Sequence, residues 1–427
     1  MAAIQRTFPT FAQGGKLGIL FSGGPASGAN AVISSVYLAA RHAGIEPVLF
    51  REGYTYLRTF NASDPHAAEK LLANGTKSLT IAKALKIRIT GGIIIGTARA
   101  NPAKDIKIIN DLKDPNKTAE MNKVLDAFEA LRIGALVSIG GDDTMRTAYL
   151  LWKYFGVPVV HVPKTIDKDY PGIEWTFGYH TAVNVSAHEI MNLMRDAQAT
   201  RGYFIVNEMG RNAGWLTEGA GIAGGATLTI TREEIEKIDS GLMIKGKVNI
   251  QALAGKIVDH IHTREKLRRP YGVIIVAEGV GELFPLKYLP RKIEKDEFGH
   301  PRLSEIDTAG ILTRLVKSIY NEKHHKSPKL TPRVIGHEIR CADPISFDTI
   351  MASILGIGAV RLAVKGQFGQ MVSLDREFEL NSQPIVDLID MQALKATGII
   401  RVANRPVQLG SSFHGVDALL EWAAVNN

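Results

Sequence analysis

The sequence of 427 residues contains a single cysteine, Cys341, so no disulfide can form within the chain. A chain with almost no cysteine is typical of a reducing compartment. The N-terminal stretch MAAIQRTFPTFAQGG lacks the continuous apolar core of a secretory signal peptide. No apolar run looks long enough to cross a bilayer. We therefore expect a cytoplasmic protein without a membrane partner.

The sequence also lacks blocks of basic residues and any RNA-binding signature, although 51 Lys and Arg against 43 Asp and Glu give a net charge of +8. Because the basic residues are dispersed, we expect no nucleic-acid partner. The charge indicates either an ordinary solvated surface or a positive cleft that attracts small phosphorylated substrates. No Walker A motif is present, and no GxGxxG turn follows directly on a predicted strand, which argues against a dinucleotide oxidoreductase.

Short apolar runs that end in glycine or proline, most of them followed by helical periodicity, predict strands of an α/β protein. Runs that are apolar throughout are covered on both faces, which is typical of parallel sheets. The length exceeds the size at which one core usually keeps growing, so we expect two domains. In such sheets ligands bind beyond the carboxyl ends of the strands. The predicted strands cover residues 16–21, 135–139, 157–162, 203–207 and 271–276.

Three strand ends carry residues suited to phosphoryl chemistry. SGGPASGAN at 22–30 is a glycine-rich turn whose N–H groups could approach a phosphate, or simply a tight turn. In GGDDT at 140–144, Asp142 could hold Mg²⁺ or cap the following helix. In PKTIDKD at 163–169, Asp167 could accept a proton from an attacking hydroxyl, Thr165 could assist it, and Lys164 could contact phosphate oxygens. A polar turn is the alternative there.

Two further motifs place arginines after strands. EMGRNAGW at 208–215 carries Arg211, and GHEIR at 336–340 carries His337 and Arg340 three residues apart. Such residues could grip a sugar phosphate, or serve a structural ion pair. Segments 281–305 and 321–332 are polar and broken by proline or glycine, so we expect surface loops there.

The chain resembles the phosphofructokinase family, because GGPxSGxN, GTAR, GGDD, PKTIDxD, MGR, AEG and GHxxR occur in the family's order between residues 22 and 340. The resemblance implies two Rossmann-like three-layer α/β domains with mainly parallel sheets. Residues 1–178 and 340–390 would form the domain that binds the phosphoryl donor and Mg²⁺. Residues 179–339 and 391–427 would form the sugar-phosphate domain.

The resemblance also implies roles for matching residues. Asp142 would bind Mg²⁺, and Asp167 would deprotonate the 1-hydroxyl of fructose 6-phosphate with help from Thr165, Asp169 and Lys164. The other expected site residues divide between the two ends of the site. Gly24, Tyr54, Arg99, Asp143 and Lys164 would line the donor site, and Met209, Gly210, Arg211, Glu278, His337 and Arg340 would meet the sugar phosphate together with Thr165, Asp167 and Asp169.

Family members commonly add two arginines from a neighbouring subunit, which implies a homodimer or homotetramer with the active site near an interface. The match is poor here. Arg201 lies one residue away from the usual spacing, and Thr331 occupies the other position, with Arg333 two residues later. Local shifts could restore these contacts, or the phosphate grip is built differently.

Asp143 predicts the donor. Relatives that use ATP typically have glycine there, whereas relatives that use pyrophosphate have GGDD and a lysine like Lys164. A carboxylate about 4 Å from the α-phosphate of ATP would cost roughly 4 kcal/mol at an effective dielectric constant near 20. We therefore expect a Mg²⁺-dependent, reversible transfer from pyrophosphate to fructose 6-phosphate. The alternatives are an ATP-dependent enzyme of the same family and a non-catalytic sugar-phosphate-binding subunit.

Overall fold

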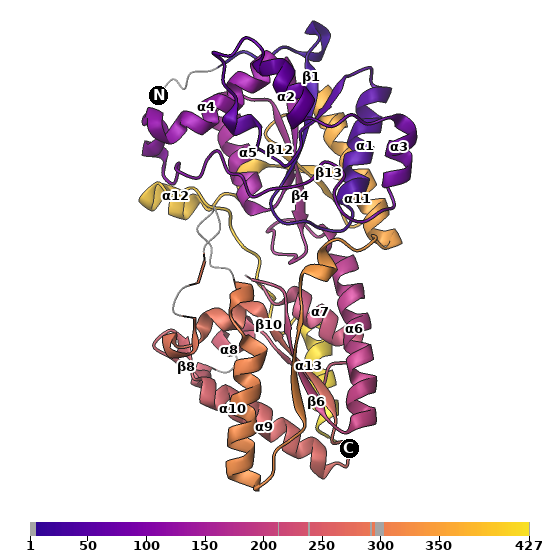
Figure 1. Cartoon of the computed structure of the whole chain (residues 1–427), viewed down its shortest axis with the longest axis vertical. Coiled ribbons are helices and arrows are strands. Elements are labelled where there is room, and N and C mark those ends of the chain that lie inside the picture. Colours follow the sequence, from indigo (N-terminus) through magenta and orange to yellow (C-terminus); the bar gives the residue numbers. More distant parts are fainter. Residues whose placement is uncertain (1–5, 212, 238–239, 291–292, 295–302, 427) are drawn as a thin grey trace.

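The computed structural model describes residues 6–211, 213–237, 240–290, 293–294 and 303–426, and these form two α/β lobes along the long axis of the molecule (Figure 1). The chain passes between the lobes several times. The upper lobe in Figure 1 holds a seven-stranded sheet, and the lower lobe holds a four-stranded sheet.

The larger sheet has the order β13-β12-β4-β3-β1-β2, with β5 paired to β4. All of its pairs are parallel except the β12–β13 hairpin. Its strands are β1 Lys16–Ser22, β2 Pro47–Leu49, β3 Ile133–Gly140, β4 Val159–Thr165, β5 Phe177–Gly178, β12 Gln370–Leu374 and β13 Leu380–Pro384.

Helices cover both faces of this sheet, because side chains alternate between its two sides along each strand. Ile19 and Val137 pack with one set of helices, and Leu20 and Leu136 pack with the other. The first set is α1 Ala29–His42, α3 Ile81–Ile87 and α11 Ser346–Val364; the second is α2 Ala67–Gly75, α4 Pro115–Ala130 and α5 Asp142–Phe155.

The smaller sheet is entirely parallel, with the order β11-β6-β10-β7. Val206 and Ile275 face α6 and α7, whereas Ile205 and Ile274 face α9 and α10, so this lobe also has three layers. Its elements are α6 Tyr179–Thr200, β6 Tyr203–Glu208, α7 Trp215–Gly224, β7 Leu228–Ile230, α8 Arg232–Lys237, α9 Ile250–Lys266, β10 Gly272–Ala277, α10 Thr308–His324, β11 Leu330–Ile335 and α13 Ser412–Ala424.

The remaining elements are short. They are β8 Met243–Ile244, β9 Lys247–Val248, α12 Met391–Thr397 and the 3-10 helices Phe11–Gln13, Leu57–Thr59, Ile109–Lys113, Ser240–Leu242, Glu278–Leu283, Leu286–Tyr288, Leu303–Glu305, His337–Arg340 and Ile385–Leu388.

The α/β architecture with mainly parallel sheets is confirmed, and each of the five predicted strands forms. The main differences lie at the edges. Strand β4 continues through Pro163 to Thr165, three residues beyond its predicted end, and the antiparallel β12–β13 hairpin was not predicted. Most of the predicted loop 281–305 lies outside the described residues or forms short 3-10 turns, while residues 321–324 belong to α10.

Helix α11 corrects the expectation that no apolar run is long enough to cross a bilayer. An 18-residue window of this 19-residue helix has a mean hydropathy of 1.6, which meets the length and composition of a membrane span. However, 56% of this window is buried inside the protein, where Met351, Leu355 and Ala359 pack in the same core as α1. Helix α11 is a core helix of the upper lobe.

The predicted boundary at residue 390 does not coincide with the packing. Leu394 and Ile400 are buried in the core of the upper lobe, together with residues of α4 and α5. The chain joins the lower lobe only near Val407, which is fully buried beside Tyr179 and Trp215. The segment 391–402 therefore packs with the upper lobe, and the functional division of the two lobes stays a prediction.

Candidate active site

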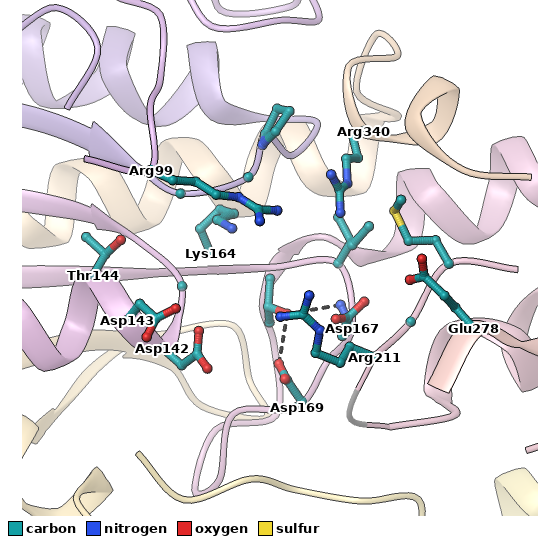
Figure 2. Close-up of a pocket in the computed structure, with 18 residues that line it drawn as sticks. Arg99, Asp142, Asp143, Thr144, Lys164, Asp167, Asp169, Arg211, Glu278 and Arg340 are labelled. Atoms are coloured by element: carbon teal, nitrogen blue, oxygen red, sulfur yellow. Dashed lines mark hydrogen bonds between the residues drawn. The ribbon is translucent and has the colours of Figure 1, made fainter. Parts of the chain in front are cut away.

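A pocket lies where the carboxyl ends of strands from both lobes meet (Figure 2). It collects residues from seven separate segments of the chain, most of which follow directly on parallel strands. This is the position that the α/β rule predicts for a ligand site. The lining residues are Gly23, Gly24, Pro25, Arg99, Gly141, Asp142, Asp143, Thr144, Lys164, Thr165, Ile166, Asp167, Asp169, Met209, Gly210, Arg211, Glu278 and Arg340.

The turn after β1 forms one wall of the pocket. Gly23 has a φ of 89°, a left-handed conformation that favours glycine. Its N–H donates to the carbonyl of Ala98 at 3.1 Å, and the Thr97 hydroxyl donates to the carbonyl of Gly23 at 2.7 Å. These two hydrogen bonds fasten the glycine turn to the segment that carries Arg99, so Arg99 and Gly24 lie on the same wall.

Asp142 and Asp143 occupy the first turn of α5, directly after the N-cap Gly141. The free N–H groups and the dipole of a helix N-terminus stabilise negative charge, so this position favours both carboxylates. Figure 2 shows the two side chains at one end of the pocket, on the same side as Lys164 and Arg99 and away from Glu278. This end of the pocket therefore combines two carboxylates with two cations.

Thr165 organises the loop after β4. Its hydroxyl donates to Asp169 Oδ1 at 2.8 Å and accepts from the N–H of Asp167 at 3.0 Å. A single side chain thereby fixes the positions of both aspartates. Asp167 Oδ1 is buried and makes no hydrogen bond to another described residue, so a lone pair on it is available to a substrate hydroxyl.

Burial shifts the protonation of this loop. Burial raises the pKa of Asp167, against the opposing charges of Arg340 and Lys164. Burial and the neighbouring Asp167 charge raise the pKa of Asp169, so the two carboxylates titrate as a pair above the usual range. Burial and the charge of Arg340 lower the pKa of Lys164 to about 8, although the carboxylate of Asp142 opposes this shift.

The opposite end of the pocket comes from the lower lobe. The N–H of Met209 donates to the carbonyl of Ile335 at 3.2 Å, and that of Gly279 donates to the carbonyl of Gly210 at 3.1 Å. A Cβ at Gly279 would lie 2.3 Å from the carbonyl oxygen of Arg211, so only glycine allows this approach. The close contact fixes Glu278 beside Arg211.

Arg340 reaches the pocket from the short helix His337–Arg340, where the chain returns from the lower lobe. Burial lowers its pKa, while the charges of Asp167 and Glu278 raise it. A cation in this position can hold an anionic group between the two ends of the pocket. The arrangement fits transfer of a charged group from one end to a polar acceptor at the other.

Residues 16–363 match the phosphofructokinase family. The chain belongs to this family. It is 37% identical over 354 residues to a Thermotoga maritima protein named pyrophosphate–fructose 6-phosphate 1-phosphotransferase, which covers 81% of this chain and 77% of that protein. A Corynebacterium efficiens protein named ATP-dependent 6-phosphofructokinase is 31% identical over 364 residues, covering 85% of this chain and 90% of that protein.

A solved pyrophosphate-dependent phosphofructokinase from Marinobacter aquaeolei has the same fold, with a TM-score of 0.63 at 16% identity; the match covers 97% of this chain and 92% of that chain. The chain is thus a phosphotransferase of the phosphofructokinase family. Sequence identity does not show whether the phosphoryl donor is pyrophosphate or ATP. An Amycolatopsis methanolica protein named pyrophosphate–fructose 6-phosphate 1-phosphotransferase is also 31% identical to this chain.

Most of the residues that the family resemblance selected line this pocket, but four do not. Tyr54 is 1% exposed and belongs to the core of the upper lobe, so it does not line this pocket, and its contact with the donor stays a prediction. His337 is exposed and lines a neighbouring pocket that shares Arg99, Glu278 and Arg340.

The two remaining arginines lie away from this pocket. Arg201 follows the last residue of α6, and a helix of this length extends about 30 Å from its N-terminal end beside the cleft. Arg333 is exposed on the edge strand β11, above the ring of Phe204. The phosphofructokinase resemblance implies that these two arginines contact a substrate bound in the active site of a neighbouring subunit.

Arg405 supports the site although no motif marks it. Its N–H donates to the carbonyl of Asp169 at 2.8 Å, and its guanidinium donates to the carbonyl of Ile173 at 2.7 Å. The C-terminal segment of this phosphofructokinase thereby braces the loop that carries both aspartates. Thr144 also lines the pocket, although the GGDDT motif alone predicts no role for it.

Proposed function

We propose that this phosphofructokinase transfers a phosphoryl group from pyrophosphate to the 1-hydroxyl of fructose 6-phosphate, giving fructose 1,6-bisphosphate and phosphate. The observation that carries the donor assignment is the Asp143 carboxylate on the wall of the pocket, beside Asp142. ATP would have to place its α-phosphate and nucleoside next to this charge, whereas pyrophosphate has neither group. Lys164 supplies a compact positive charge for the short donor.

In the proposed step, Asp167 accepts the proton of the 1-hydroxyl as that oxygen bonds to the nearer phosphorus of pyrophosphate. The bond from this phosphorus to the bridging oxygen breaks, and phosphate leaves with the electron pair. Thr165 holds Asp167 and Asp169 in place, while Lys164 and Arg99 balance the charge on the leaving phosphate. Because Thr165 already holds both aspartates, the proposed catalysis relies on positioning and electrostatics. We expect the reaction to be reversible.

The sugar phosphate would occupy the opposite end of the pocket. Met209, Gly210 and Glu278 would meet its hydroxyl groups, and Arg211 would contact its charged end. Arg340 and His337 would bind the 6-phosphate or the transferred group, because they come from the short helix where the chain returns from the lower lobe to the upper lobe. The upper lobe would thus serve the donor and the lower lobe the sugar.

The residues at the donor end fit Mg²⁺. Asp142 and Asp143 offer hard carboxylate oxygens in the pocket wall, and Mg²⁺ usually binds one or two carboxylates together with substrate phosphates. Of these, Asp142 is the proposed ligand. When bound, the ion would neutralise charge on the pyrophosphate oxygens. Asp142 would orient it from the first turn of α5.

The oligomeric state and the cellular location of the enzyme are also proposals. We infer a homodimer or homotetramer, because Arg201 and Arg333 can reach a sugar phosphate only in a neighbouring subunit. A cytoplasmic location is supported by the single cysteine.

The donor assignment is tested by comparing kcat/KM for pyrophosphate and for ATP at saturating fructose 6-phosphate and Mg²⁺. We expect pyrophosphate to be preferred by on the order of 10²-fold or more, from the charge repulsion estimated above. Preference for ATP would identify an ATP-dependent enzyme instead. Absence of turnover with either donor would favour the non-catalytic subunit.

The pH dependence of donor use tests Lys164. Its ammonium group is charged below a pKa of about 8 and neutral above it, so kcat/KM for pyrophosphate should fall as pH rises through 8. In Lys164→Arg the cation persists to much higher pH, so this decline should disappear even if the overall rate is lower. An identical alkaline decline in both proteins would show that another group causes it.

A further inference from the structure

A cluster of carboxylates lies in the lower lobe, outside the residues that line the active site. It joins Glu234 of α8 to Asp417 and Glu421 of the C-terminal helix α13. One carboxylate oxygen from each residue lies within 4.8 Å of the other two. Like charges at this spacing repel one another unless a positive group lies among them.

One carboxylate oxygen of each of the three side chains accepts a hydrogen bond from Thr229 or Thr231. The hydroxyl of Thr229 donates to Asp417 Oδ1 at 2.9 Å, and the N–H of Thr229 donates to Glu421 Oε1 at 2.5 Å. The N–H of Thr231 donates to Glu234 Oε2 at 3.0 Å. Strand β7 and the residue after it therefore orient the carboxylates. Asp417 is 2% exposed, and its second oxygen, Oδ2, is buried without a hydrogen-bond partner among the described residues.

A fourth carboxylate provides a separate observation. Glu218 of α7 is completely buried, and neither of its oxygens has a hydrogen-bond partner in the described part of the chain. His414 Nδ1 lies 3.4 Å from Oε1 without forming a hydrogen bond. Burial and then the charge of Asp417 raise the pKa of Glu218. A buried carboxylate without a partner is costly in free energy.

Positive charge near the cluster is scarce. Lys256 of α9 acts on Glu421, and the ring of His414 lies beside Glu218. Glu233, the neighbour of Glu234, adds a further carboxylate, although its Oε1 accepts from the N–H groups of Gly214 and Val407 at 3.0 Å each. The side chains therefore supply much less positive than negative charge.

We propose that Glu234, Asp417 and Glu421 bind a divalent cation, and that this ion fixes α13 to α8. The ligands are all carboxylates, which select hard cations such as Ca²⁺ and Mg²⁺. Two oxygens bound to one Ca²⁺ lie at most about 4.6–5.2 Å apart, and two bound to one Mg²⁺ at most about 4.2 Å, so an upper limit of 4.8 Å is compatible with Ca²⁺ and requires closer approach for Mg²⁺. The site is structural and distinct from the ion proposed at Asp142.

Thermal unfolding of the full chain tests this site. After treatment with EDTA and without substrates, wild-type protein should gain roughly 5 °C or more in Tm when Ca²⁺ or Mg²⁺ is added about a hundredfold above its Kd. Parallel titrations with the two ions identify which one the site prefers. Asp417→Asn and Glu421→Gln should lose this gain, and in EDTA they should be at least as stable as wild type, because each removes an uncompensated charge.

Asp142→Asn serves as the matched control, since it alters the other proposed ion site and should keep the full gain in Tm. Equilibrium dialysis with Ca²⁺ and with Mg²⁺ supplies a measurement that does not depend on how the variants fold: wild type and Asp142→Asn should each retain one ion per chain. The proposal is overturned if the Tm of wild type does not respond to either ion, or if Asp142→Asn abolishes ion binding while Asp417→Asn preserves it.

Discussion

Replacing Asp167 with asparagine should lower kcat by on the order of 10²–10⁴, the usual contribution of a general base. The substitution preserves the size of the side chain and the backbone hydrogen bond to Thr165, but it removes the group that accepts the proton. Initial rates at saturating pyrophosphate and fructose 6-phosphate measure the effect directly.

The structure predicts that this loss concerns chemistry and not folding. Burial already disfavours the charged form of Asp167, as its raised pKa shows, so a neutral amide should not reduce Tm. KM for both substrates should change only a few-fold. Asp387→Asn makes the same chemical change on an exposed residue and should leave kcat unaltered. Near-normal turnover of Asp167→Asn would exclude Asp167 as the base.

Replacing Asp143 with glycine should shift the donor preference toward ATP by on the order of 10–10³-fold in the ratio of kcat/KM values. The estimate follows from a charge repulsion of roughly 4 kcal/mol at 4 Å, reduced wherever Mg²⁺ or water screens it. Measuring kcat/KM for both donors with the same preparation separates a change of preference from a general loss of activity.

Asp143→Asn distinguishes charge from space, because the amide fills the same volume without the negative charge. If charge dominates, Asp143→Asn should reproduce most of the shift seen with glycine; if the side chain blocks the nucleotide sterically, only glycine should. Both variants lie in the first turn of α5, where losing a carboxylate costs helix stability of about 0.3–1 kcal/mol, so Tm must be recorded as well. An unchanged donor ratio in both variants would refute the role of Asp143.

The sequence predicted the pocket well where chemistry follows directly on an apolar strand. Asp142, Lys164 and Asp167 each lie at the carboxyl end of a strand that could be recognised from its apolar run, and parallel pairing brings these ends together. Met209 and Glu278 were predicted only from the family resemblance, and they also follow directly on strands, in the second sheet. Local patterns sufficed because the strand, the turn and the functional residue are neighbours in the chain.

Tertiary structure alone decided the features that depend on contacts between distant segments. Tyr54 comes shortly after strand β2 in the sequence, yet its side chain is buried in the core of the upper lobe and does not line the pocket. Arg405 braces the Asp169 loop across more than 230 residues, and Asp417 meets Glu234 through the docking of α13 on the lower lobe. Local sequence patterns do not predict such contacts, because the overall fold determines which distant segments lie side by side. The sequence therefore determined which residues can perform the chemistry, and the fold determined which of them meet.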